Sequence, residues 1–280
     1  MRGVECIESK SRGAQRCRDG EVIEDARATK LLAFRGLERI PVEEAKAVRN
    51  TVGIIDAAAF TKHLVRGPGA TAFLDHLTCN KLPNVGRINL TYALTEAGTT
   101  RTEYTIVRLK QDEYYLISAG AWTAYDADFL IKAAEDWMAQ GGGYIDIHDV
   151  TTQWGVYALA GPNARALLKD IVKDANPDTV LSNKRFPWLS YRDIELGMCP
   201  VRAVRVAYTG ELGWELHYPI EFGRYLWDLI WSVGEKHGLK GVGARAQNWL
   251  ANPLVIGGVV VVVLGLFALW WWLDREPEPE

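Results

Sequence analysis

The segment 207–218, AYTGELGWELHY, carries two acidic residues four positions apart, Glu211 and Glu215. Glu211 lies between two glycines in a predicted turn and is expected to be solvated. Glu215 lies on the strand that follows, where successive side chains point to opposite faces. If the face of Trp214 packs in the core, Glu215 and His217 point the other way, either to solvent or into a cleft. A carboxylate in a cleft can accept two hydrogen bonds from adjacent N–H donors of a ligand.

The elements expected to position these residues are arranged as two similar sets, one in each half of the globular region. Segments 63–75 and 157–169 both read as a short apolar strand, a Gly-Pro turn and a helix that opens with small residues. Proline sets a helical φ near the start of each helix. Further strands and an amphipathic helix follow each segment. The strands are expected at 89–94, 103–109, 114–119, 201–208 and 214–218, and the helices at 123–140 and 222–237.

This pattern predicts an α+β fold made of two related antiparallel-sheet units with packed helices. The expected parts are a polar N-terminal extension (1–44), a first subdomain (45–150), a second subdomain (151–248) and a C-terminal segment (249–280). Small ligands usually bind in a cleft between two such units.

The C-terminal segment is predicted to hold a single transmembrane helix and an acidic tail. Residues 253–273 form a run of 21 residues without a charge, which is long enough to span about 30 Å as a helix. More basic residues precede this run than follow it, which places the globular part in the cytoplasm. If the tail is instead an artefact of gene fusion, the protein is expected to be soluble, in the cytoplasm or the mitochondrial matrix.

Charge and motifs argue against several classes of function. A formal net charge of −3 gives no basis for nucleic-acid binding. The four cysteines and five histidines lack the spacing of metal ligands, so no metal site is expected. The sequence also lacks GxGxxG after a strand, GxxxxGK[ST], GxSxG and HExxH, the usual marks of nucleotide-binding proteins, serine hydrolases and zinc proteases.

Four ordered motifs support a specific resemblance: VGIIDAAAFTKHLVRGPGATAFLDHLTCN, ALTEAGTTRTEYTIVRL, GVYALAGPNARALL and VAYTGELGWELHYP. Over about residues 48–248, the chain resembles the folate-binding aminomethyltransferase family. That family includes the glycine-cleavage T-protein and the C-terminal halves of dimethylglycine and sarcosine dehydrogenases. The segment GLKGVGARAQN is most similar to the dehydrogenase branch.

The resemblance implies a tetrahydrofolate-binding module that transfers an aminomethyl or methylene unit in glycine, sarcosine or dimethylglycine breakdown. It places the pterin ring of the folate against Tyr208 and Glu215. It also places a carboxylate, usually Asp, near the reacting nitrogens, and Glu103 occupies that position here. The tyrosine of the preceding strand aligns with Leu90, and Tyr92 lies two residues later on the same face. Because Glu103 belongs to the first repeat and Glu215 to the second, the two carboxylates could face one cleft from two sides.

The chain also departs from the family pattern. We expect it to lack the LRLE-type segment with its arginine, the third, barrel-like domain that closes the folate cavity, and the FAD-binding half of the dehydrogenases. The resemblance therefore implies a separate FAD-dependent dehydrogenase as a partner, besides folate. The alternative is a catalytically inactive, membrane-tethered binding or scaffold protein that keeps the fold. The sequence leaves turnover open between these two hypotheses.

Overall fold

The computed structural model describes residues 15–16, 22–23 and 39–243, with side chains from residue 42 onward. The chain divides into two compact units, Met1–Glu43 and Glu44–Glu280. In the first unit, the short strands β1 (Gln15–Arg16) and β2 (Val22–Ile23) pair antiparallel. Helix α2 (Arg39–Asn50) begins at the end of the first unit. The two larger sheets and the candidate site belong to the second unit.

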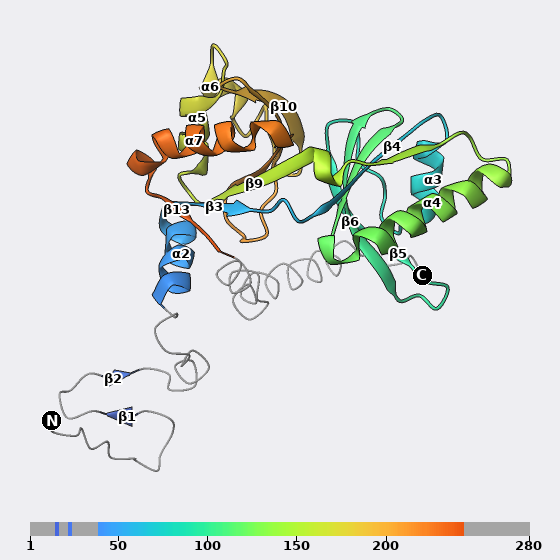
Figure 1. Ribbon diagram of the computed structural model, residues 1–280, viewed down its shortest axis with the longest axis horizontal. Coiled ribbons are helices and arrows are strands. Elements are labelled where there is room, and N and C mark those ends of the chain that lie inside the picture. The colour runs from blue at the N-terminus through green and yellow to red at the C-terminus, as the bar shows by residue number, and fades with distance from the viewer. Residues whose placement is uncertain (1–14, 17–21, 24–38, 244–280) are drawn as a thin grey trace, which may run out of the picture. The chain divides into compact units, whose positions relative to one another are not determined.

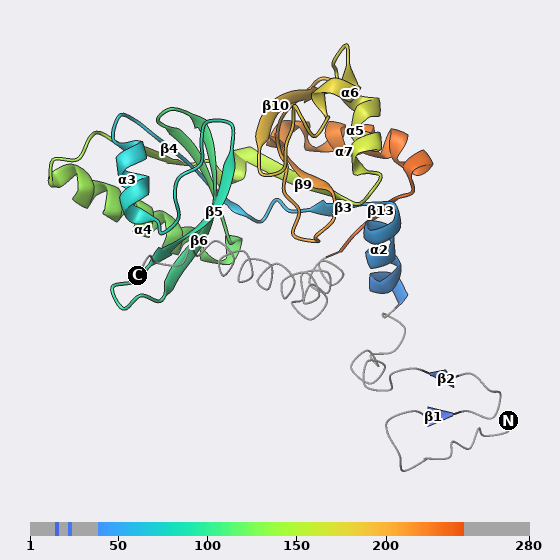
Figure 2. The same ribbon diagram turned by 180° about the vertical axis from the view of Figure 1, so that it is seen from behind.

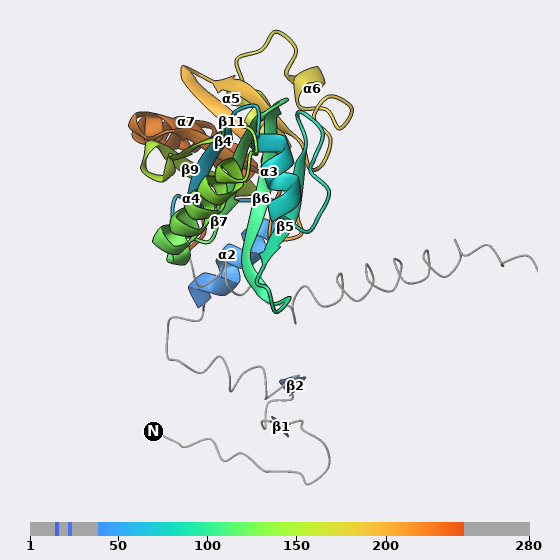
Figure 3. The ribbon, with the colours of Figure 1, turned by 90° about the vertical axis from the view of Figure 1, so that its right-hand side faces the viewer.

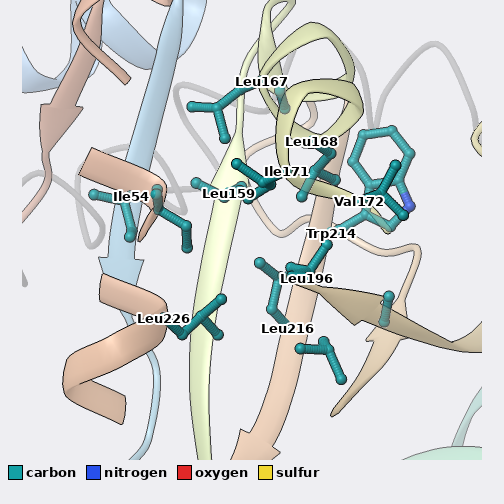
Figure 4. Packing of buried hydrophobic residues seen from close by; sticks show 14 of the residues in the cluster. Ile54, Leu159, Leu167, Leu168, Ile171, Val172, Leu196, Trp214, Leu216 and Leu226 are labelled. Carbon is teal, nitrogen blue, oxygen red and sulfur yellow. The ribbon is translucent and has the colours of Figure 1, made fainter. Parts of the chain in front are cut away.

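A six-stranded sheet forms one half of the second unit (Figure 1). Helices α5 (Ala164–Ile171) and α7 (Gly223–Gly234) pack on one face of it, where Trp214 and Leu216 join a large apolar core (Figure 4). All pairs of neighbouring strands are antiparallel except the last, which is parallel. In spatial order the strands are β10 (Tyr191–Leu196), β11 (Cys199–Val204), β12 (Gly213–Pro219), β9 (Trp154–Ala160), β3 (Val52–Asp56) and β13 (Leu239–Gly241).

A five-stranded antiparallel sheet forms the other half. Helices α3 (Ala70–Leu77) and α4 (Thr123–Ala139) pack on one face of this sheet, and β5 and β6 extend past them as a long hairpin (Figure 3). In spatial order the strands are β5 (Ile88–Leu94), β6 (Thr100–Lys110), β7 (Glu113–Ser118), β4 (Thr61–Arg66) and β8 (Asp146–Asp149). The remaining helices are short: η1 (Gly120–Trp122), η2 (Thr151–Gln153), α6 (Pro177–Val180), η3 (Ile220–Phe222) and η4 (Glu235–His237).

The predicted repeat is present in both halves. In the first, β4 leads through Gly67, with φ +124°, into α3, and in the second, β9 leads through Gly161, with φ +138°, into α5. A side chain at residue 161 would be strained, because a Cβ there would lie 2.4 Å from the carbonyl oxygen of Thr51. Glycine at these turns therefore brings each helix back onto its own sheet.

The two repeats exchange their leading strands. Strand β3 directly precedes β4 in the chain but pairs with β9, while β8 directly precedes β9 but pairs with β4. Figure 2 shows the chain leaving β3 in the six-stranded sheet and crossing to β4 in the five-stranded sheet. The crossings are fixed by equivalent backbone hydrogen bonds, Ala57 N–H to Val156 O and Val150 N–H to Lys62 O, both 2.9 Å. Residues 52–56, which lie in the first predicted subdomain, thus complete the sheet of the second.

Each sheet also has a face that its own helices do not cover, and residues of these two faces form one apolar cluster. The five-stranded sheet contributes Tyr115 and Ile117, and the six-stranded sheet contributes Trp154 and Val204. This cluster ties the two halves of the second unit together and borders the candidate site.

The prediction of a C-terminal transmembrane helix is corrected by the structure. No helix in the described part of the chain is long and apolar enough to cross a bilayer. The run 253–273, on which that prediction depended, lies outside the described residues. The fold class is therefore α+β with two sheets, and the predicted membrane anchor with a cytoplasmic globular part is not retained.

Candidate functional site

A cavity of about 490 Å³ opens between the two sheets of the second unit. Its walls come from β6, β9, β12, the ends of β3 and β7, the loop after β3, the residues after β7 and the loop before β12, and most of the lining side chains are apolar. Its ionisable side chains are Glu103, Glu215, Arg101 and Tyr208. The site residues expected on each repeat thus meet around one cavity, with the exception of Tyr92.

Glu215 reaches the cavity because of the alternation along β12. Trp214 and Leu216 point into the helix-covered core, so the carboxylate of Glu215 points to the opposite face. Strand β12 is central in its sheet, with Glu215 paired to Ala158 on one side and Val204 on the other. Only 4% of Glu215 is exposed, so its side chain points into the cavity rather than to bulk solvent.

His217 contacts the Glu215 carboxylate through its imidazole ring. Its Nε2 lies 3.3 Å from Oε2 of Glu215, and its Nδ1 lies 3.1 Å from the hydroxyl of Tyr115 on the facing sheet. Burial lowers the pKa of His217, although Glu215 opposes that shift. A neutral imidazole whose Nε2–H donates to the carboxylate, while Nδ1 accepts from Tyr115, fits both contacts. From the alternation along the strand, His217 was expected on the face of Glu215, but no role was predicted for it.

Tyr208 forms an aromatic wall of the cavity. Its ring stacks on Phe60 with centroids 6.1 Å apart and an interplanar angle of 23°, and its hydroxyl lies 3.4 Å from Oγ1 of Thr105. The residue is 45% exposed, which leaves the ring accessible to a ligand. Burial of the hydroxyl, followed by the charge of Glu215, raises the pKa of Tyr208. A planar ring system could therefore lie beside both Tyr208 and the Glu215 carboxylate.

Glu103 and Tyr92 lie opposite each other on β6 and β5. Glu103 lines the cavity and is exposed, while Tyr92 is half-buried and is not part of the lining. The pKa of Tyr92 is raised, first by a hydrogen bond to the Glu103 carboxylate. Tyr92 thus contacts the expected site through Glu103 rather than directly. Leu90, at the position of the family's tyrosine, is also outside the lining and is exposed.

Glu211, which was expected to be solvated, forms an ion pair in the structure. Its Oε1 lies 2.6 Å from Nη1 of Arg49 on α2, and both side chains are partly exposed. The ion pair ties the turn before β12 to α2. Because the pair is partly solvated, its contribution to stability is expected to be small.

Lys62 is a buried charge that was not predicted. Its ammonium group donates to the carbonyl oxygens of Phe60 (2.7 Å), Ala58 (2.9 Å) and Thr151 (3.4 Å). Burial lowers the pKa of Lys62 to about 8, and the charges of Asp149, Asp56 and Glu215 limit the shift. Lys62 thereby holds the loop that carries Phe60 against the cavity. Within residues 42–243, no group of three or more His, Cys, Asp or Glu side chains could hold a metal ion.

Comparisons with known proteins agree with this architecture. The family model described as the GCVT N-terminal domain matches residues 24–251. The chain belongs to this family. It is 34% identical over 207 residues to the mitochondrial dimethylglycine dehydrogenase of Mus musculus, covering 74% of the chain and 23% of that protein. It is 30% identical over 214 residues to the sarcosine oxidase subunit alpha of Rhizobium meliloti (strain 1021), covering 74% of the chain and 21% of that protein.

A solved structure shares the fold. The glycine cleavage system aminomethyltransferase T from Bartonella henselae matches with a TM-score of 0.63 and 22% identity, over 75% of the chain and 53% of that structure. The chain therefore has an aminomethyltransferase-like, T-protein-type fold, with homologues in glycine, sarcosine and dimethylglycine metabolism. It spans less than a quarter of the length of the mouse dehydrogenase.

Proposed function

We propose that the cavity binds tetrahydrofolate and that the protein is a one-carbon transfer module linked to glycine, sarcosine or dimethylglycine breakdown. The observation that carries this proposal is the buried carboxylate of Glu215, which faces the cavity beside the aromatic ring of Tyr208. A pterin ring offers adjacent N–H donors on one edge, and a single carboxylate can accept two of them. Family membership supports the same ligand class.

The residues present fit such a ligand. The cavity volume of about 490 Å³ lies within the range of roughly 300–1,000 Å³ that is usual for small-molecule sites. Glu215 would accept hydrogen bonds from the pterin edge, held in orientation by His217. Tyr208 and Phe60 would offer a flat apolar surface to the ring. When bound, tetrahydrofolate supplies the nitrogen that accepts the one-carbon unit.

Glu103 is the residue we assign to catalysis. Its carboxylate lines the cavity and lies beside the hydroxyl of Tyr92, whose pKa it raises. A carboxylate here can take up a proton or stabilise a cationic donor group by its charge. The donor is expected to come from a separate FAD-dependent dehydrogenase, since two of the relatives are named as a dehydrogenase and an oxidase subunit.

Titration calorimetry of the full chain with tetrahydrofolate tests the binding proposal. Micromolar affinity is expected, and absence of binding at millimolar ligand would refute it. Transfer of a one-carbon unit, supplied by a separate FAD-dependent dehydrogenase acting on dimethylglycine, tests catalysis. Glu103→Gln should keep the affinity and lower the transfer rate. Binding without any transfer by the wild type would instead favour a folate-binding protein without turnover.

A further inference from the structure

Arg101 is a charged residue of the cavity wall that the proposed pterin contacts do not use. It lies on β6, two residues before Glu103, and is half-buried. The carbon atom of its guanidinium group lies 3.4 Å from the ring centroid of Tyr125 and 4.8 Å from that of Phe129, both on α4. Such cation–π contacts fix the plane of a guanidinium group but leave its N–H edge free to donate.

In the part of the chain whose side chains are described, no acidic side chain lies within ion-pair distance of Arg101. Two other arginines that stack on aromatic rings do have polar partners within the protein. Arg205, above the ring of Trp214, donates to backbone and side-chain oxygens of residues 183–186, and Arg202, above Trp154, lies 3.6 Å from the carboxylate of Asp193. Since guanidinium stays charged at any physiological pH, Arg101 brings to the cavity wall a cation that has no ion-pair partner among the described side chains.

The position of Arg101 along β6 indicates which part of a ligand it would meet. Thr105, whose hydroxyl contacts Tyr208, lies four residues further along the strand. At about 3.3 Å per residue, Arg101 is displaced by roughly 13 Å from the end of the cavity where Tyr208 lies. Along β6, Arg101 is thus separated from Tyr208 and from the Glu215 carboxylate that acts on it.

We propose that Arg101 binds a carboxylate of the ligand that occupies this cavity. Its planar pair of N–H donors matches a carboxylate in a bidentate arrangement. The inference rests on the proposed function, which supplies two sources of a carboxylate: the glutamyl tail of the folate and the carboxyl group of an N-methylated amino-acid donor.

Three probes distinguish these sources in calorimetric titrations of the full chain: tetrahydrofolate, a tetrahydropteroyl amide that lacks both tail carboxylates, and N,N-dimethylglycine. If the tail is the source, Arg101→Gln should raise the dissociation constant for tetrahydrofolate by about 10- to 100-fold and leave that for the amide unchanged. If the donor is the source, only the dissociation constant for dimethylglycine should rise. Arg224→Gln, which removes an exposed arginine on α7, is the matched control and should change none of them.

Equal dissociation constants for wild type and Arg101→Gln with all three probes would overturn the inference. In that case the proposed function still stands if both pterin compounds bind the wild type. Conversely, if no pterin compound binds but dimethylglycine binding depends on Arg101, the proposed function fails while the carboxylate site remains. Failure of all three probes to bind the wild type would refute both. Matching circular dichroism melting curves would confirm that Arg101→Gln is folded.

Discussion

The stability of this protein should fall steeply between pH 7.5 and 5.5 because two histidines are buried in the neutral form. His217 is fully buried and His63 is 1% exposed, and burial lowers the pKa of each below its ordinary value of 6.5. In the unfolded chain both imidazoles take up a proton as the pH falls through 6.5. The unfolded state then binds more protons than the folded state, so the free energy of unfolding decreases with falling pH.

The size of the effect follows from the linkage relation. If neither histidine binds a proton in the folded protein above pH 5.5, each costs up to RT ln(1 + 10), about 1.4 kcal/mol, at pH 5.5. At pH 7.5 the same expression gives less than about 0.1 kcal/mol. The two residues together should therefore lower the free energy of unfolding by at most about 2.7 kcal/mol across this interval. Carboxylates whose pKa is lowered in the folded protein, such as Asp146, lose their contribution to stability near and below pH 3.8, which is outside this interval.

Urea unfolding at the two pH values, followed by tryptophan fluorescence, measures this difference. His217→Gln and His63→Gln should each remove about half of the pH dependence. His76→Gln, at an exposed position, is the control and should leave it unchanged. A wild-type decrease below about 0.5 kcal/mol, or one that persists in both buried-site variants, would refute the assignment of neutral buried histidines.

Three further outcomes are expected. Trp214→Ala should lower the free energy of unfolding by about 3–5 kcal/mol in urea titrations, because its fully buried ring fills the core of the six-stranded sheet. Gly161→Ala should cost about 1–3 kcal/mol in the same assay because of its positive φ, whereas Gly241→Ala, with its nearest atom 3.9 Å from the added Cβ, should change little. The folded protein should lose the Lys62 proton near pH 8 while the unfolded chain keeps it until about 10.5, so stability should rise by about 1 kcal/mol from pH 7.5 to 9.0 relative to Lys62→Met, and equal pH profiles for the two proteins would contradict this.

Local patterns in the sequence were sufficient to predict much of the fold. The Gly-Pro turns marked the strand-to-helix transitions at 67 and 161, and the helix expected at 123–140 is α4 (Thr123–Ala139). Periodicity and turn residues are properties of short segments, so they can be recognised without knowing which strand or helix each segment packs against. Strand β10, which lies at the edge of its sheet and is mostly exposed or half-buried, was not predicted because its apolar residues are sparse.

The exchange of β3 and β8 could not be predicted in the same way. Residues 52–56 precede the first repeat, and their apolar run is equally compatible with pairing to β4 or to β9. Only the packing of complete sheets decides between these partners. The buried position of Lys62 was not predicted for a similar reason. Its carbonyl partners Phe60 and Thr151 lie in the two connections that cross between the sheets, β3 to β4 and β8 to β9.

The candidate site was predicted in part. Alternation along β12 correctly placed Glu215 on the face opposite Trp214, and the structure shows that this face borders a cavity that Glu103 also lines. Tyr92 lies one strand away from that lining. The contact between His217 and Tyr115 joins two residues that lie 102 positions apart in the sequence and on different sheets, so no local signal could reveal it.

The central claim is that the buried carboxylate of Glu215 binds the pterin of a reduced folate. Its most direct test is the dissociation constant of tetrahydrofolate for Glu215→Gln, measured by calorimetry beside wild type and the exposed control Glu135→Gln. Loss of a charge-assisted contact of about 1.5–3 kcal/mol predicts a rise of about 10- to 150-fold for Glu215→Gln and no change for Glu135→Gln. Equal affinity of wild type and Glu215→Gln would contradict the account.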